Sequence, residues 1–120
     1  MLSNKIITFI LIPVLLSCSA FSLGSKYEKD YQREWCKGEI EVVLADRSRV
    51  DCMTDTHAIE IDWCNKWAEG VGQSLYYARV TGKKPGLALI CSLKHIERYV
   101  ERVRLAAPEI DIFIIDKVGL

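Results

Sequence analysis

The feature that most constrains the fold is a nearly continuous apolar run at residues 87–91, directly after Pro85-Gly86. An apolar run without polar alternation is typical of a strand that is buried on both faces, as in a parallel sheet that helices cover. Segments with helical patterning flank the run, one ending near Val80 and one starting near Ser92. The sequence therefore predicts an α/β fold.

Periodicity predicts the remaining elements. Apolar patterning indicates strands at residues 39–45, 49–53, 57–63 and 110–115, and helices at residues 26–35, 65–80 and 92–106. Asn65 and Ser92 are expected to cap the second and third helices, because such side chains accept hydrogen bonds from the first unpaired N–H groups of a helix. The predicted order is α-β-β-β-α-β-α-β, within a single domain at residues 26–120.

The charge balance excludes one class of protein. Lys and Arg together number 16, as do Asp and Glu, so the formal net charge is +0. A protein that coats DNA through its phosphates needs a large cationic excess. Such a DNA-coating protein is therefore excluded.

The N-terminal segment is predicted to direct export. Lys5 precedes an apolar stretch at residues 6–16, which is the pattern of a signal peptide at residues 1–17, followed by a tether at residues 18–25. The stretch is shorter than the about 20 residues that cross a bilayer. No transmembrane helix is therefore expected in the mature protein.

A cysteine at the expected cleavage site suggests lipidation. Leu15-Leu16-Ser17-Cys18 resembles a bacterial lipobox, in which Cys18 carries the lipid and becomes the first mature residue. Cleavage after Ala20 is the alternative. The predicted location is the periplasm or the outer membrane, with the lipid on Cys18 as the contact with the membrane.

The other four of the five cysteines can form two disulfides, for which three connectivities exist. A right-handed crossover sets the strand at residues 87–91 parallel to the strand at residues 57–63, so Cys64 and Cys91 lie at the same end of the sheet. That leaves Cys36, at the end of the first helix, for Cys52. Four free thiols are the alternative.

Matching apolar residues across the first three strands predicts a register. The predicted pairs are Leu44–Val50, Val42–Cys52, Cys52–Ile59 and Val50–Ile61. Asp51 then lies directly across from Glu60, and Glu41 and Asp62 share that face. Carboxylates at this spacing repel one another, and a divalent cation relieves the repulsion. The register therefore predicts a metal site at Glu41, Asp51, Glu60 and Asp62.

The helix after these strands is predicted to add polar groups to the same site. Lys66, Gly70, Gln73 and Tyr77 form one stripe along it, apart from the packing stripe that contains Trp67. Lys66 is expected to point back toward Asp62 and Glu60. A lysine and an amide placed there could hold a phosphate and a water beside the metal.

These motifs resemble the PD-(D/E)XK nuclease superfamily. The resemblance covers roughly residues 31–115 and is carried by Asp51, by Ala58-Ile59-Glu60-Ile61-Asp62 and by the Gln-x-x-x-Tyr spacing of Gln73 and Tyr77. It implies an αβββαβ restriction-endonuclease-like core, here with an added C-terminal helix and strand. One departure is that Asp62 stands where the family has a lysine.

The resemblance also implies the chemistry. Asp51 and Glu60 would carry Mg²⁺ (or Mn²⁺) with help from Glu41, and Gln73 and Tyr77 would orient the phosphate. Lys66 is the candidate for the missing basic group. The predicted function is that of an exported Mg²⁺-dependent phosphodiesterase that cuts DNA in the cell envelope. The alternative is a non-catalytic envelope lipoprotein that uses a degenerate nuclease-like fold as a binding module.

Overall fold

The structure is a computed structural model, and it describes residues 24–117. Its helices are α1 (Glu28–Trp35), α2 (Trp67–Thr81) and α3 (Ile96–Ala106), and its strands are β1 (Glu39–Val43), β2 (Arg49–Met53), β3 (His57–Trp63), β4 (Lys84–Cys91) and β5 (Asp111–Asp116). Short 3₁₀ turns at Cys64–Lys66 and Leu93–His95 precede α2 and α3. The predicted order of helices and strands is confirmed.

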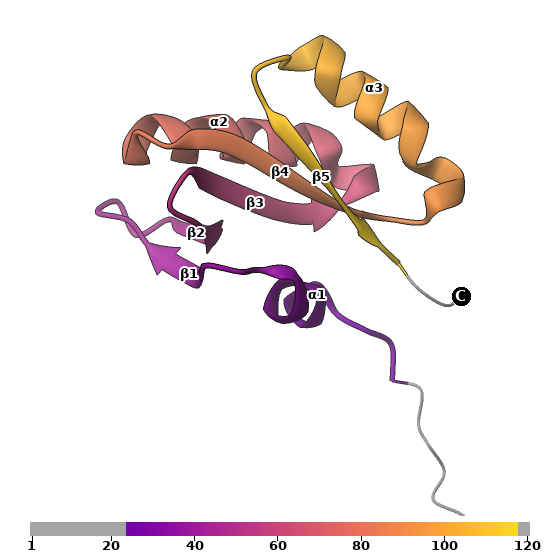
Figure 1. Ribbon diagram of the computed structural model, residues 1–120, viewed down its shortest axis with the longest axis horizontal. Coiled ribbons are helices and arrows are strands. Elements are labelled where there is room, and N and C mark those ends of the chain that lie inside the picture. The colour runs from indigo at the N-terminus through magenta and orange to yellow at the C-terminus, as the bar shows by residue number, and fades with distance from the viewer. Residues whose placement is uncertain (1–23, 118–120) are drawn as a thin grey trace, which may run out of the picture.

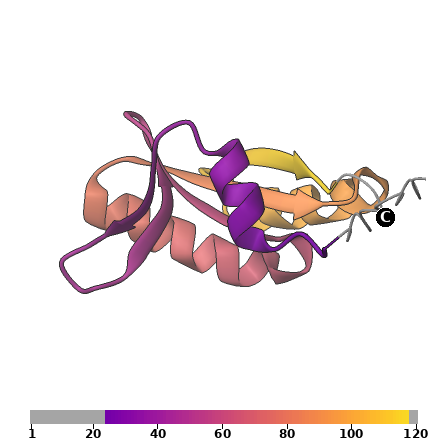
Figure 2. The ribbon, with the colours of Figure 1, turned by 90° about the horizontal axis from the view of Figure 1, so that it is seen from below.

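The five strands form one mixed sheet in the order β1-β2-β3-β4-β5. The pairs β1–β2 and β2–β3 are antiparallel, whereas the pairs β3–β4 and β4–β5 are parallel. Helices α2 and α3 lie on one side of the sheet and α1 on the other (Figure 1). Seen from below, α1 lies across the strands (Figure 2). The predicted α/β class is therefore confirmed, as a five-stranded sheet with three helices.

β4 is buried on both faces, which explains its continuous apolar sequence. Leu87 and Leu89 pack in the cluster that includes residues of α2 and α3, such as Val103. Ala88 and Ile90 belong to the opposite cluster, which α1 covers. β4 also has a hydrogen-bonded strand on each side, and its residues 86–91 are all buried.

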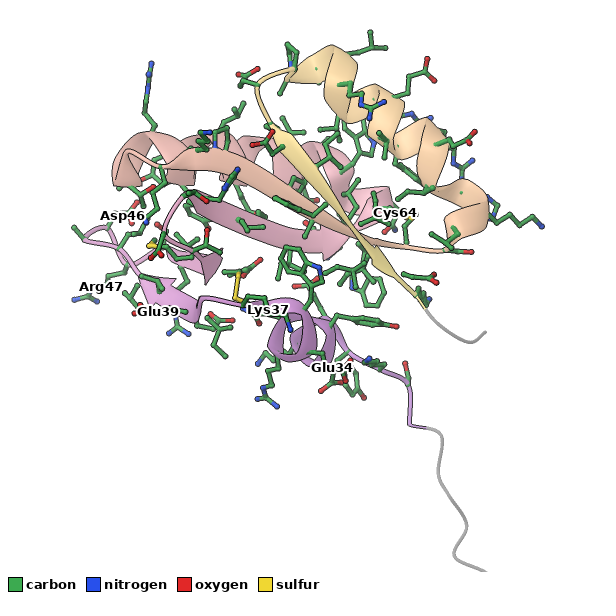
Figure 3. The ribbon with its side chains drawn as sticks, in the orientation of Figure 1. Glu34, Lys37, Glu39, Asp46, Arg47 and Cys64 are labelled. Carbon is green, nitrogen blue, oxygen red and sulfur yellow. A yellow bond between two sulfur atoms is a disulfide. The ribbon has the colours of Figure 1, made fainter. Side chains whose placement is uncertain are left out.

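Two disulfides connect elements that are distant in sequence. Cys36 is bonded to Cys52, and Figure 3 shows this bond in yellow beside the end of α1. Cys64 is bonded to Cys91 at the carboxyl ends of β3 and β4. Of the three possible connectivities, this is the one predicted from the sequence.

The predicted register of β1 against β2 is wrong by two residues. Val42 pairs with Val50 and Ile40 with Cys52, so Leu44 lies in the turn rather than in a strand. The turn is closed by a hydrogen bond from the Leu44 N–H to the Ser48 carbonyl (2.8 Å) and contains Arg47 with a φ of 71°. This longer turn shortens the first strand, which was predicted to run to residue 45.

The predicted helix caps are also wrong. Within the part of the chain that the structure describes, Asn65 and Ser92 make no capping hydrogen bond, and a 3₁₀ turn precedes each helix instead. The Trp67 N–H bonds to the Cys64 carbonyl, and the His95 N–H bonds to the Ser92 carbonyl (2.9 Å). These backbone hydrogen bonds take the place of the side-chain caps.

Several predictions fall outside the described residues. The signal peptide at residues 1–17, the lipidation of Cys18 and most of the tether lie there. Among the helices of residues 24–117, none has the length and apolar character that crossing a membrane requires.

Candidate functional site

The structure brings Asp51 and Glu60 together where β2 separates from β3. The two strands pair at Cys52–Ile59, which sets Asp51 across from Glu60. Beyond that pair, the Asp51 carboxylate itself accepts the hydrogen bond of the Ile61 N–H (2.8 Å). The Asp51 carboxyl group raises the pKa of Glu60, so the two carboxyl groups lie close together. We call these two residues the acid pair.

Glu60 is protonated at neutral pH. Glu60 is only 6% exposed, and within residues 24–117 its Oε2 atom has no hydrogen-bond partner. Burial, followed by the nearby charge of Asp51, raises the pKa of Glu60 to about 10. Burial also raises the pKa of Asp51, although the hydrogen bond from the Ile61 N–H opposes this rise. Glu60 therefore holds the proton and leaves one oxygen unsatisfied in a buried place.

Asp62 lies next to the acid pair on β3 and is likewise buried. Its Oδ1 accepts a hydrogen bond from the N–H of Trp63 (2.9 Å). Burial and then the charge of Glu28, on α1, raise the pKa of Asp62 to about 6. The acidic region thus includes Glu28, which the sequence analysis did not single out.

Lys66 is exposed, and its positive charge acts on the acids nearby. It lowers the pKa of both Asp62 and Glu28, although the overall shift of each is upward. Within residues 24–117, Lys66 forms no ion pair with a carboxylate. The charge of Lys66 therefore acts on Asp62, and the orientation of its ammonium toward Asp62 and Glu60 stays a prediction.

Glu41 lies at the margin of the site. Its Oε1 accepts a hydrogen bond from Gln32 Nε2 (3.3 Å), and its Oε2 is 3.8 Å from an Arg49 nitrogen. The Gln32 amide also donates to the main-chain carbonyl of Asp51 (2.8 Å) and is itself buried. The sequence analysis missed Gln32, because its position on α1 carries no signal of a partner on a strand.

The predicted stripe on α2 is divided between the interior and the surface. Tyr77 is buried and packs in a cluster with Val50 and Ala58, and its pKa is raised by burial and by Glu60 and Asp51. Gly70 allows α2 to approach the sheet, since a Cβ there would lie 2.7 Å from Leu87 Cδ1. Gln73 is exposed and forms no side-chain hydrogen bond within the described residues.

The predicted site of four carboxylates is not assembled. Among residues 24–117, no three or more His, Cys, Asp or Glu side chains form a group that could hold a metal ion. The reason is that Asp62 is turned toward its own strand, and Glu41 is held by Gln32 and Arg49. Two carboxyl groups, those of Asp51 and Glu60, remain directly adjacent.

Comparisons with known proteins do not place the chain in a group. No family model, no curated protein and no solved structure matches it.

Proposed function

We propose that the chain is an exported Mg²⁺-dependent nuclease of the PD-(D/E)XK type, which cuts DNA in the cell envelope. The observation that carries this proposal is the buried Glu60 Oε2, which has no hydrogen-bond partner among residues 24–117 and lies beside a second carboxyl group. A carboxyl pair that must hold a proton to remain buried is a place where a divalent cation can replace that proton. Two disulfides are compatible with export.

The residues present fit Mg²⁺. This ion binds oxygen ligands and is commonly held by one or two carboxylates together with waters and substrate phosphates, rather than by a cage of protein ligands. Asp51 and Glu60 supply such a pair, and Asp62 stands next to them. A third protein ligand is therefore not required for this metal.

The chain's own groups divide the remaining tasks. When bound, the metal supplies a Lewis acid for a phosphoryl oxygen and lowers the pKa of a bound water. The Lys66 ammonium, near the acids, would bind a substrate phosphate. The exposed Gln73 amide, on α2, would offer a further hydrogen bond to it. Tyr77 is buried against Val50 and Ala58, close enough to the acid pair for the charges of Glu60 and Asp51 to raise its pKa.

The second candidate is a binding module without catalysis. Asp62 stands where the resembling family has a lysine, and Lys66 has to supply the basic group from the next helix. If Lys66 cannot reach the phosphate, the chain keeps a nuclease-like fold without hydrolysis. A lipid on Cys18 would then serve only to hold the module at the membrane.

Cleavage assays with the mature protein separate these functions. We expect Mg²⁺ or Mn²⁺ to support cutting of plasmid, linear or single-stranded DNA, and chelator to abolish it. Asp51→Ala should reduce cutting by at least about 100-fold, since even groups that only orient a metal ligand contribute about 10–100-fold.

The matched control is Asp55→Ala, because Asp55 is an exposed aspartate in the turn after β2. This variant should cut like the wild type. Absence of cutting under every metal condition would favour the binding module, and cutting that Asp51→Ala leaves intact would place the active site elsewhere.

A further inference from the structure

Helix α1 is fastened to β2 at two neighbouring points. Gln32 Nε2 donates to the carbonyl of Asp51, and one residue further along β2, Cys52 is bonded to Cys36. Gln32 lies in the last turn of α1, and Cys36 directly follows the helix, where its N–H donates a hydrogen bond to the Gln32 carbonyl (2.9 Å). The disulfide and the amide therefore act on the same stretch of β2, the one that presents the acid pair.

We propose that Gln32 is a positioning residue for Asp51 and that the Cys36–Cys52 disulfide makes this positioning depend on oxidation. This inference rests on the proposed function of the acid pair. In the oxidised protein, α1 holds Gln32 against β2, and Asp51 faces Glu60. In the reduced protein, the amide leaves Asp51, and the acid pair loses its geometry.

The short length of α1 makes the disulfide important. A helix of eight residues is not stable by itself, so its position depends on tertiary contacts. Its aromatic contacts, Tyr31 with Trp63 and Trp35 with Phe113, reach β3 and β5. Toward β2, the disulfide is the covalent connection that keeps Gln32 within hydrogen-bonding distance of Asp51.

Gln32 has a specific role because its amide is buried. It is 5% exposed, and it donates both to the carbonyl of Asp51 and to the carboxylate of Glu41. Asp51 in turn accepts from the Ile61 N–H. Gln32 thus fixes the backbone of Asp51, while Ile61 fixes its side chain. Loss of the first contact frees the backbone that carries the second.

The reductant is a dithiol. One of its thiolates attacks the half-buried Cys36 sulfur, the Cys36–Cys52 bond breaks and Cys52 leaves as a thiolate, which takes up a proton. The second thiol of the reductant then displaces Cys36 from the mixed disulfide. The protein gains two thiols, and the dithiol is oxidised to its own disulfide. A chain kept reduced before export would therefore hold an unassembled site.

The test compares the two disulfides. The double variant Cys64→Ser/Cys91→Ser retains the Cys36–Cys52 disulfide. It should bind Mn²⁺ like the wild type, as measured by the EPR signal of the ion. Dithiothreitol should then lower its Mn²⁺ affinity at least 10-fold and accelerate hydrogen exchange of the Ile61 amide at least 10-fold, and reoxidation should restore both.

Gln32→Met tests the amide with both disulfides present. It should weaken Mn²⁺ binding and accelerate Ile61 exchange in a protein that still unfolds cooperatively. Trp35→Phe is the control on the same helix: it should lower the melting temperature and leave Mn²⁺ affinity unchanged, because it does not touch Asp51 or Glu41.

The outcomes separate this inference from the proposed function. If the oxidised protein binds Mn²⁺ and reduction or Gln32→Met changes neither Mn²⁺ affinity nor Ile61 exchange, the inference is overturned and the metal site stands. If Ile61 exchange responds as expected but the oxidised protein binds no Mn²⁺, the positioning by Gln32 is supported and the metal function is overturned.

Discussion

Replacing Glu60 by glutamine should abolish metal-dependent cleavage and at the same time stabilise the fold. Glutamine removes a metal ligand but can still donate a hydrogen bond to Asp51. At pH 7 the unfolded chain has Glu60 ionised, near its ordinary pKa of 4.5, whereas the folded pKa is about 10, so folding must take up a proton. This uptake costs up to about 3 kcal/mol at pH 7, and Glu60→Gln removes the cost.

The melting temperature of a domain of this size shifts by about 4–8 °C for each kcal/mol, so the expected rise is up to about 12–24 °C. Thermal melts and cleavage assays on the same preparation measure both effects. Glu97→Gln is the matched control, since Glu97 is an exposed glutamate on α3, and it should change neither quantity. A Glu60→Gln protein that cuts DNA normally, or that melts well below the wild type, would contradict this account of the acid pair.

Stability of the metal-free protein should fall as the pH rises. A group whose pKa is higher in the folded state than in the unfolded state binds more protons when folded, so its contribution is present at low pH and is lost with increasing pH. The pKa of Asp62 rises from 3.8 to about 6, so the stability that its proton contributes is lost between about pH 4 and 6. The pKa of Glu60 is about 10, so the stability that its proton contributes is lost from about pH 4.5 to 10.

The free energy of unfolding should fall by up to about 1.4 kcal/mol for each pH unit and for each proton that folding takes up. Melting temperatures at pH 5, 7 and 9 measure it, and Glu60→Gln should flatten the curve above pH 6. Millimolar Mg²⁺ or Mn²⁺ should restore stability most at pH 9, because the cation takes the place of the proton. A melting temperature that is constant or rises over this range would contradict the pKa shifts.

The sequence was sufficient to predict the fold class and the disulfides because they depend on a few strong patterns. The apolar run at residues 87–91 requires cover on both faces, and the crossover before it sets Cys64 beside Cys91. The alternation at residues 49–53 and 57–63 determines which side chains of these two strands lie on the same face of the sheet. Asp51 therefore lies across from Glu60, although the neighbouring register of β1 is shifted by two residues.

The parts that could not be predicted depend on how α1 docks on the sheet. Gln32 and Asp51 are 19 positions apart, and nothing in the periodicity of either segment indicates that an amide meets a carbonyl there. Glu41 has a φ of 54°, which interrupts the regular alternation on which its predicted position was based. The Asp62 side chain accepts a hydrogen bond from the Trp63 N–H, and this side-chain conformation does not follow from the sequence pattern either.

Crystals of the mature protein grown with Mn²⁺ test the central claim most directly. The anomalous scattering of Mn²⁺ locates the ion independently of any activity. We predict a peak within coordination distance of one carboxylate oxygen of Asp51 and one of Glu60, with the Glu60 proton displaced. A map in which the acid pair carries no peak at saturating Mn²⁺ would contradict the claim that these two residues form a metal site.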